Sequence, residues 1–314
     1  MTTEQGHDTT SHDIKDGIYP GVSMEDYQAW PFASRSALTV LALGGTPAHY
    51  RASMVYHTRS NKSMTIGTIA HAALLEPELF HNYRVLPDTV RQRRGKDYEQ
   101  LCADNPGVEW VTPSEWVSVG EQKCRAELIR ENALRHPLVA DMLERATHRE
   151  VSVVTTDHIT HMRYKIRPDI AAPDFLADVK THSKKTPYDA ARSGYNFGLH
   201  IQSAMYSDGW TRETGGKPDM NPIPFWFIFI ESEPPHLVTV HNGHAAYDER
   251  NQEVSPTAYL ELGREQYRNA LRQVRDCEQT GIWPGHPTEV LDMAIPRFAG
   301  MEGWYQIEKT GGMI

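Results

Sequence analysis

The segment HMRYKIRPDIAAPDFLADVKT, residues 161–181, decides how this chain folds. Residues 161–170 alternate between polar and apolar side chains, and residues 175–181 follow after a turn at Ala172-Pro173-Asp174. The preceding segment, VSVVTTD at 151–157, is rich in β-branched residues. Three short runs of this kind, separated by short connections, predict an antiparallel meander of three strands.

Two acids and one lysine lie on the second and third of these predicted strands. Asp169 ends the second strand, whereas Asp178 and Lys180 are two residues apart on the third and therefore point to the same face. The short turn is expected to bring Asp169 alongside them. Neighbouring carboxylates are costly unless a cation neutralises them, and their oxygens suit Mg²⁺ or Mn²⁺. A metal bound there can activate water and stabilise charge on a phosphate, while Lys180 orients that water or contacts the phosphate.

Helical patterns flank the strands on both sides. Ser34 can cap a short helix that begins SRSAL at 34–38, and the apolar residues of MTIGTIAHAALL, 64–75, repeat at helical spacing. Further elements are predicted at 114–135 (a helix capped by Ser114), 187–212 (one long helix), 224–231 and 237–241 (strands) and 255–279 (a helix ended by Gly281).

The order of these elements predicts a mixed α/β fold with a central sheet flanked by helices. Because the sequence contains no repeat and no low-complexity linker, residues 17–280 are expected to form a single domain with an N-terminal helical extension. Residues 1–16 are polar and are expected to be disordered, and residues 281–314, punctuated by proline and glycine, are expected to form an irregular tail.

Composition narrows the class of protein. The net charge of −9 disfavours a protein that coats DNA nonspecifically. Electrostatic fields act over only about 8–10 Å, however, so the net charge does not exclude an enzyme that binds DNA at one site. The longest apolar run, FWFIFI at 225–230, is too short to span a bilayer, and the polar N-terminus lacks a secretion signal. A cytoplasmic protein without a membrane partner is expected.

Two pairs of residues at helical spacing are candidates to join the acids. Gly67 and His71 are four apart on one predicted helix, and Gln202 and Tyr206 are four apart on another. Gly67 would allow another chain or DNA to approach closely. Both pairs would have to face the strands that carry the acids.

Together these motifs resemble a known family. Pro168-Asp169 followed by Asp178-Val179-Lys180 resembles the signature of the PDDEXK nuclease superfamily. Gly67 to His71 and Gln202 to Tyr206 resemble the GxxxH and QxxxY motifs of its RecB-like branch. Within that branch the chain is most similar to the C-terminal nuclease domain of exodeoxyribonuclease VIII (RecE) and its phage relatives, over roughly residues 17–280.

The resemblance implies a restriction-endonuclease-like core of order αβββαβ and a set of roles. By it, His71, Asp169, Asp178 and the carbonyl of Val179 would bind Mg²⁺, which Mn²⁺ can replace. Lys180 would be the catalytic lysine, and Gln202 and Tyr206 would contact DNA or support the site. The first residue of the DxK triplet is Asp178 where the superfamily more often has Glu, a substitution that is usual in this branch.

The resemblance also implies a Mg²⁺-dependent exonuclease that degrades double-stranded DNA ends, 5′ to 3′. Its 3′ single strands would serve a partner annealing protein in phage or prophage recombination, and the enzyme would form a ring-shaped homo-oligomer. One alternative is a RecB-like nuclease of the CRISPR-adaptation type, but three scattered cysteines, Cys102, Cys124 and Cys277, cannot supply its four-cysteine cluster. The other is a non-catalytic PDDEXK module, which typically loses the lysine or an acid.

Several further residues have two open interpretations. Lys184 and Lys185 follow the third strand and could meet phosphates or remain solvated. The basic patch from Arg91 to Lys96 could grip the DNA backbone or form an exposed loop. Glu150 could be a further metal ligand, although a solvated strand-end glutamate is the commoner case. His57, His161 and His182 have no assigned role.

Overall fold

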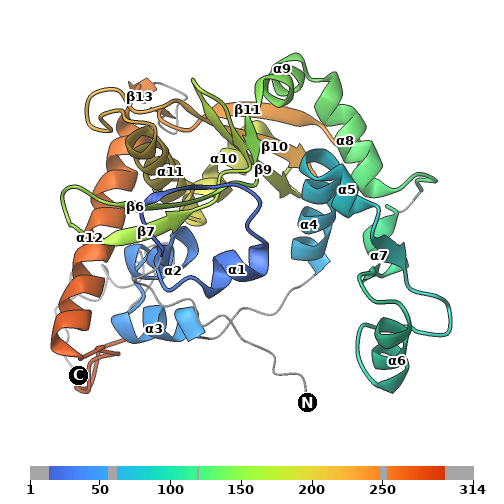
Figure 1. Ribbon diagram of the computed structural model, residues 1–314, viewed down its shortest axis with the longest axis horizontal. Helices are drawn as coiled ribbons and strands as arrows, with labels where there is room; N and C mark the ends of the chain where they lie inside the picture. The colour runs from blue at the N-terminus through green and yellow to red at the C-terminus, as the bar shows by residue number, and fades with distance from the viewer. Residues whose placement is uncertain (1–13, 56–61, 119, 248–252, 294–314) are drawn as a thin grey trace, which may run out of the picture.

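The computed structural model describes residues 14–55, 62–118, 120–247 and 253–293 of the 314-residue chain (Figure 1). Of the two ends expected to be irregular, residues 1–13 and 294–314 lie outside the described residues. Residues 281–293 contain no helix or strand. The fold is mixed α/β, as predicted.

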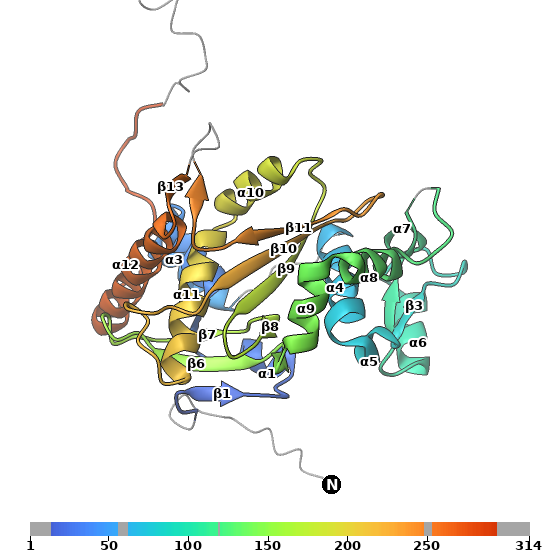
Figure 2. The same cartoon turned by 90° about the horizontal axis from the view of Figure 1, so that it is seen from above.

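A five-stranded mixed sheet lies at the centre of the molecule (Figure 2). Its order is β11 (Val238–Asn242), β10 (Phe225–Glu231), β9 (Leu176–His182), β8 (Ile170–Ala171) and β5 (His148–Arg149). Strands β9 and β10 run parallel, and the other neighbours are antiparallel. The parallel pair requires a crossover, which the helices between residues 187 and 213 provide.

A second, four-stranded sheet has the order β1 (Gly17–Tyr19), β6 (Ser152–Thr156), β7 (Arg163–Ile166) and β2 (Ala33–Ser34). The predicted meander is therefore wrong in one respect, because its first strand lies in this sheet, its third strand in the central sheet, and its second strand is divided between the two. The second strand is divided into β7 and β8 around Pro168, which cannot donate a ladder hydrogen bond. The neighbouring segment, which passes from β5 to β6, bends beside Asp169. The bend is at Glu150, whose amide donates a hydrogen bond to the carbonyl of Asp169 at 3.0 Å.

Helices cover both faces of the central sheet (Figures 1 and 2). On one face, Phe225, Phe227 and Phe229 form a core with α11 (Leu199–Glu213) and α12 (Ala258–Thr280). On the other, Val179, Ile228 and Ile230 pack against three helices. These are α4 (Lys62–Leu75), α8 (Arg125–Arg135) and α9 (Pro137–Arg145). Alternate residues of each strand thus enter different cores.

Two predicted helices are divided. The helix expected at 187–212 is α10 (Pro187–Asn196) followed by α11, because Gly198 between them adopts a left-handed conformation with φ 70°. The helix expected at 114–135 is α7 (Pro113–Trp116) and α8. Its start is capped by Thr112 and Glu115 in a capping box, not by Ser114, and Gly120 with φ 86° interrupts it.

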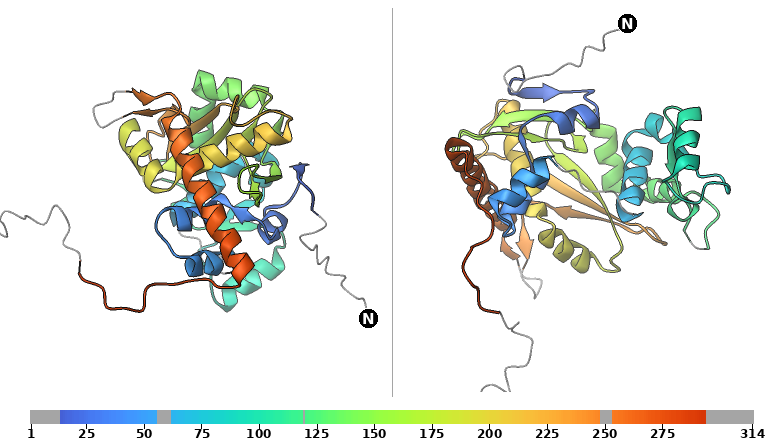
Figure 3. Two further views of the ribbon diagram at one scale, coloured as in Figure 1. Left: turned by 90° about the vertical axis from the view of Figure 1, so that its left-hand side faces the viewer. Right: turned by 90° about the horizontal axis from the view of Figure 1, so that it is seen from below.

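The remaining elements surround this core. Ser34 caps α2 (Arg35–Ala42) as predicted, accepting from the amide of Ala37 at 3.3 Å. Gly281, with φ 71°, ends α12, which runs along one side of the molecule (Figure 3). The others are α1 (Met24–Ala29), α3 (Pro47–Val55), α5 (Pro77–Phe80), β3 (Tyr83–Val85), α6 (Lys96–Asp104), β4 (Glu109–Val111), β12 (Ala246–Tyr247) and β13 (Glu253–Ser255). Among the described helices, none has the length and apolar character needed to cross a membrane.

Candidate active site

A cavity of about 470 Å³ lies where the two sheets meet. Its lining brings together candidates from separate parts of the chain: His71, Asp169, Asp178, Lys180, Gln202 and Tyr206, joined by Glu150. His71 comes from α4, the acids and the lysine from the strands, and Gln202 and Tyr206 from α11. The fold therefore brings six of the sequence-predicted residues together, and adds Glu150 to them.

Asp178 occupies the centre of β9, with 1% of its surface exposed. Lys180 Nζ forms an ion pair with Asp178 Oδ1, and Gln202 Nε2 donates a hydrogen bond to Asp178 Oδ2. Both carboxylate oxygens therefore have a polar neighbour. The Oε1 atom of Gln202 is buried and has no hydrogen-bond partner among the described residues.

Asp169 lies beside Asp178, at the bend between the sheets. Its Oδ2 atom accepts a hydrogen bond from the amide of Val179 at 2.6 Å. Burial, and next the negative charge of Asp178, raise the pKa of Asp169 to about 8. A carboxyl group whose pKa is raised beside a second buried carboxylate is typical of a site that binds a cation.

His71 connects α4 to these strands. Its Nε2 lies 2.8 Å from the carbonyl oxygen of Val179, and its Nδ1 lies 3.6 Å from both Glu150 Oε1 and Asp169 Oδ2. Burial lowers the pKa of His71, but the charges of Asp169 and Glu150 outweigh it and raise the pKa to about 9. The imidazole is therefore held in place by the backbone on one side and by the acids on the other.

Glu150 is the member that sequence reasoning undervalued. Its side chain is only 11% exposed, so the interpretation as a solvated strand-end residue is wrong. Arg167 Nε donates to Glu150 Oε2 at 3.0 Å, and Arg167 is fixed in turn by Ser152 Oγ and the carbonyl of Val22. Glu150 also has φ 48°, a left-handed conformation that non-glycine residues rarely adopt and that concentrates at functional sites.

The donor set fits a hard divalent cation. One ligand atom each from His71, Glu150 and Asp169 lie within 4.8 Å of one another. Carboxylate oxygens with one imidazole suit Mg²⁺ or Mn²⁺. Two predicted ligands are engaged differently: Val179 accepts a hydrogen bond from His71 through its carbonyl, and Asp178 contacts Lys180 and Gln202.

Tyr206 lies one helical turn after Gln202 and lines the same cavity. Its ring packs edge-on against Phe225, with centroids 6.0 Å apart. Burial raises the pKa of Tyr206 well above its ordinary value, so the phenol stays neutral. A neutral hydroxyl facing the acids suits a supporting role in the site.

Three cationic residues of the cavity escaped sequence reasoning, one of which is Arg167, the partner of Glu150. Arg35 lines it from the start of α2, within the SRSAL stretch. Lys165 lines it from β7, and its buried ammonium donates to the carbonyls of Tyr27, Gln28 and Trp30 at 2.7–3.0 Å. Burial lowers the pKa of Lys165 to about 8. Lys165 therefore anchors the end of α1 at the rim of the cavity.

Other candidates lie outside the cavity. Lys184 and Lys185 are exposed in the connection between β9 and α10. Arg93 of the basic patch is used internally, donating to Glu115 Oε1 at 2.7 Å, whereas Arg91, Arg94 and Lys96 are exposed. A Cβ on Gly67 would lie 3.2 Å from Thr181 Oγ1, so this glycine permits close packing of α4 on β9.

Two of the three unassigned histidines lie outside the site. His182 packs edge-on against Phe229, with ring centroids 5.7 Å apart. His161 lies in the turn between β6 and β7, and His57 lies outside the described residues.

Comparison with known proteins agrees with this fold. No protein with a curated description matches the chain. The crystal structure of a candidate exonuclease from Eubacterium rectale is 14% identical in sequence, covers 93% of this chain and 99% of its own, and superposes with a TM-score of 0.51. A second solved structure, that of SSO0001, is 14% identical over 64% of this chain and 85% of its own, with a TM-score of 0.24 that supports no conclusion. Residues 34–293 match the family model described as a PDDEXK-like domain of unknown function (DUF3799), and the chain therefore belongs to this PDDEXK-like family.

Proposed function

We propose that this chain is a metal-dependent deoxyribonuclease. The observation that carries the proposal is the convergence of His71, Glu150 and Asp169 within 4.8 Å, beside the Asp178–Lys180 ion pair. These residues come from four separate elements or bends of the chain, and a purely structural role would not require so many ionisable groups in one cavity.

Each residue has a specific task in phosphodiester hydrolysis. A divalent cation held by His71, Glu150 and Asp169 would supply positive charge to acidify a water molecule and neutralise the attacked phosphate. Lys180 offers a second, compact positive charge, and its ion pair with Asp178 fixes its ammonium within the cavity. Gln202 orients Asp178, and Tyr206 closes the cavity behind it.

The finer proposal is an exonuclease that uses Mg²⁺ and acts on double-stranded DNA ends, 5′ to 3′. It is supported by the motif resemblance to the exodeoxyribonuclease VIII nuclease domain and by the shared fold of the candidate exonuclease from Eubacterium rectale. The same resemblance supports a homo-oligomeric ring in a bacterial or phage-infected cytoplasm. Its 3′ single-stranded product would pass to an annealing protein.

A non-catalytic module is disfavoured because Asp169, Asp178 and Lys180 are all present and gathered in one cavity. A nuclease of the CRISPR-adaptation type is disfavoured because Cys124 and Cys277 are buried and distant in sequence, and only Cys102 remains besides them.

The decisive experiment incubates end-labelled linear duplexes and covalently closed circles with Mg²⁺, and in parallel with EDTA. We expect the linear duplex alone to be degraded, only with Mg²⁺, and label placed at the 5′ end to be released first. Asp178→Asn should abolish release, whereas Asp174→Asn, an exposed acid two residues before β9, should not. No Mg²⁺-dependent cleavage of either substrate would refute the nuclease, and cleavage of closed circles would refute the exonuclease.

A further inference from the structure

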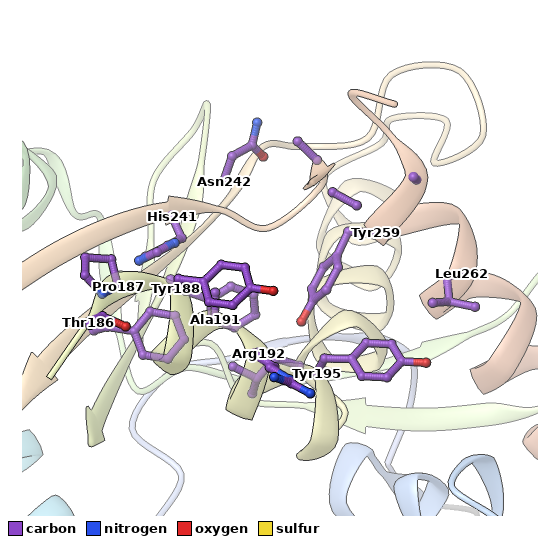
Figure 4. Close-up of a pocket in the computed structure, with 16 residues that line it drawn as sticks. Thr186, Pro187, Tyr188, Ala191, Arg192, Tyr195, His241, Asn242, Tyr259 and Leu262 are labelled. Atoms are coloured by element: carbon purple, nitrogen blue, oxygen red, sulfur yellow. The ribbon is translucent and has the colours of Figure 1, made fainter. Parts of the chain in front are cut away.

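A second cavity, of about 950 Å³, lies outside the active site (Figure 4). It is bounded by α10, the beginning of α12 and the strands β10 and β11. None of its lining residues lines the active-site cavity. None of the residues that line it has a role in the hydrolysis proposed above, so the cavity requires a separate explanation.

The lining of this cavity is rich in aromatic rings. Tyr188 and Tyr195 reach it from α10, and Tyr259 from the first turn of α12 (Figure 4). Phe227 and Phe229 of β10 also line it. Tyr188 and Tyr195 are 48% and 45% exposed, and the Tyr195 ring also stacks on His200 with ring centroids 4.9 Å apart. Flat, accessible rings around an open cavity are suited to stack with a flat ligand.

The cavity lies next to the active site on the same face of the central sheet. In the parallel register, Phe227 pairs with Asp178 and Phe229 pairs with Lys180. Paired residues of neighbouring strands project on the same face and lie about 5 Å apart. The aromatic cavity therefore begins one strand away from the Asp178–Lys180 ion pair.

The charge around the cavity favours an anionic ligand. Among the described residues that line it, Arg192 is the one that carries a full charge, because burial lowers the pKa of His241. Thr186 also lines the cavity, and the exposed residues Lys184 and Lys185 directly precede it. One arginine thus lies among the rings, two lysines directly precede a lining residue in sequence, and the described lining residues include no carboxylate.

We propose that this cavity binds the bases of an unpaired DNA strand, which stack on Tyr188 and Tyr195 while Arg192 contacts the backbone. Single-strand-binding surfaces combine aromatic platforms with positive charge in this way. The proposal rests on the proposed nuclease function, since it places the unpaired strand beside the site that would generate it. It also assigns a role to Lys184 and Lys185 at the entrance of the cavity, where they would attract phosphates.

The test measures binding of a short fluorescein-labelled oligothymidylate by anisotropy, in EDTA so that no cleavage occurs. We expect Tyr188→Ala and Tyr195→Ala each to weaken binding by about tenfold, since stacking of one base on one ring contributes about 1–3 kcal/mol. Both side chains are half-exposed, but Tyr195 also stacks on His200, so circular dichroism of each variant must match that of the wild type. Arg192→Gln should reduce the slope of log affinity against log salt concentration by about 0.7, the value for one phosphate contact on a single strand.

Matched controls separate stacking from general damage. Tyr188→Phe and Tyr195→Phe keep the rings and should retain wild-type affinity. Tyr98→Ala removes a partly exposed tyrosine from α6, in the lobe away from this cavity, and should have no effect (Figures 1 and 2). Loss of affinity in the phenylalanine variants equal to that in the alanine variants would overturn the stacking proposal.

Photo-crosslinking gives a positive readout. An oligonucleotide that carries 5-iododeoxyuridine should crosslink to peptides that contain Tyr188 or Tyr195. Unchanged oligothymidylate affinity in every variant, together with crosslinks elsewhere, would overturn the proposal and is the result expected if the cavity serves a protein partner. Because binding is measured without metal, the two proposals can fail separately. A protein that binds DNA through these tyrosines but does not cleave it would refute the nuclease proposal alone. A protein that cleaves DNA but does not bind it through these tyrosines would refute this site alone.

Discussion

Asp178 uses both of its carboxylate oxygens within the protein, one with Lys180 and one with Gln202. Glu150, His71 and Asp169 instead direct their ligand atoms toward a common point. The residues of the site thus form two groups. His71, Glu150 and Asp169 are placed to hold a cation, whereas Asp178 and Lys180 form an ion pair with each other. This division gives Lys180 a task distinct from metal binding.

Replacement of Lys180 tests that task. Lys180→Met should lower the rate of DNA cleavage by about 100-fold or more, the size of effect that follows loss of one positioned proton-transfer or charge-stabilising group. Lys180→Arg keeps the charge but not the compact ammonium, so its cleavage rate should fall between the rates of the wild type and of Lys180→Met. The measurement is single-turnover cleavage of a labelled duplex at saturating Mg²⁺. An active Lys180→Met enzyme would show that the lysine serves only to pair with Asp178.

Arg167 is expected to act through Glu150. It donates to Glu150 Oε2, to Ser152 Oγ and to the carbonyl of Val22, and so holds the glutamate in its strained conformation. Arg167→Met should weaken Mn²⁺ binding by about 10- to 100-fold, as loss of a residue that orients a metal ligand typically does. Calorimetric titration with Mn²⁺ measures this directly.

The rate of DNA cleavage by Arg167→Met at saturating Mn²⁺ is the second measurement. It should be affected less than the Mn²⁺ affinity, because a positioning residue alters the ligand and not the reacting atoms. The matched control is Arg145→Met, which removes an arginine paired with Asp141 and Asp174 on the surface. Equal Mn²⁺ affinity in the Arg167 and Arg145 variants would show that Glu150 is not a ligand.

At the scale of elements, the site depends on a bend shared by two chain segments. The change from β5 to β6 at Glu150 and from β7 to β8 at Asp169 occurs at the same level, joined by a backbone hydrogen bond of 3.0 Å. The bend places one acid from each segment at the junction of the two sheets. Helix α11 then presses Gln202 and Tyr206 against the same junction, supported from behind by α12.

The crossing of α11 and α12 is close enough to require glycine. A Cβ on Gly263 would overlap the carbonyl oxygen of His200 and would lie 2.8 Å from the Cβ of Ala204. Gly263→Ala must therefore separate the two helices, and we expect it to lower the free energy of unfolding by about 1–3 kcal/mol, the usual cost of overpacking. Urea denaturation measures this change.

Gly285→Ala is the control for Gly263, since a Cβ there would meet only the side chain of Ala48 at 4.0 Å. Its effect should stay within about 0.5 kcal/mol, as for most surface substitutions. Similar stability of the two variants would show that the helices adjust without cost.

At the scale of the whole molecule, buried polar groups make stability depend on pH. His244 accepts amide hydrogen bonds from Tyr259 and Leu260 through its carbonyl, and its Nε2 lies 2.9 Å from Ser207 Oγ. Burial, and next the positive charge of Arg264, lower the pKa of His244 to about 4. The histidine therefore stays neutral in the folded protein at pH values where the unfolded chain would be protonated.

The direction of the pH effect follows from proton binding. Between pH 6.5 and about 4 the unfolded state binds a proton at His244 that the folded state does not. The contribution of His244 to stability is thus complete above pH 6.5 and is lost as the pH falls toward 4. We expect a loss of about 1–3 kcal/mol from this group over that interval.

His244→Gln should make the decline in unfolding free energy below pH 6.5 shallower than in the wild type, because glutamine does not titrate. His81→Gln, at an exposed position, should leave the decline unchanged. Urea denaturation at a series of pH values measures both. An identical decline in the wild type and in His244→Gln would contradict the assignment.

The sequence by itself determined most of the helices and strands and selected six residues that the fold brings into one cavity. Strand and helix periodicity identified β9, β10, α4 and α12, and the motif order selected His71, Asp169, Asp178, Lys180, Gln202 and Tyr206. The predictions of strands and helices succeeded because they depend on local spacing, which backbone geometry converts directly into shared faces.

Tertiary structure alone decided the features that depend on contacts between distant segments. The division of the meander between two sheets, the inclusion of Glu150, the contact of Val179 with His71 and the contact of Asp178 with Gln202 all involve partners outside the local pattern. Whether a strand-end glutamate is solvated or buried depends on Arg167 and His71, which are 17 and 79 positions away in sequence. Burial and charge pairing are properties of the folded neighbourhood, so no single-segment pattern contains them.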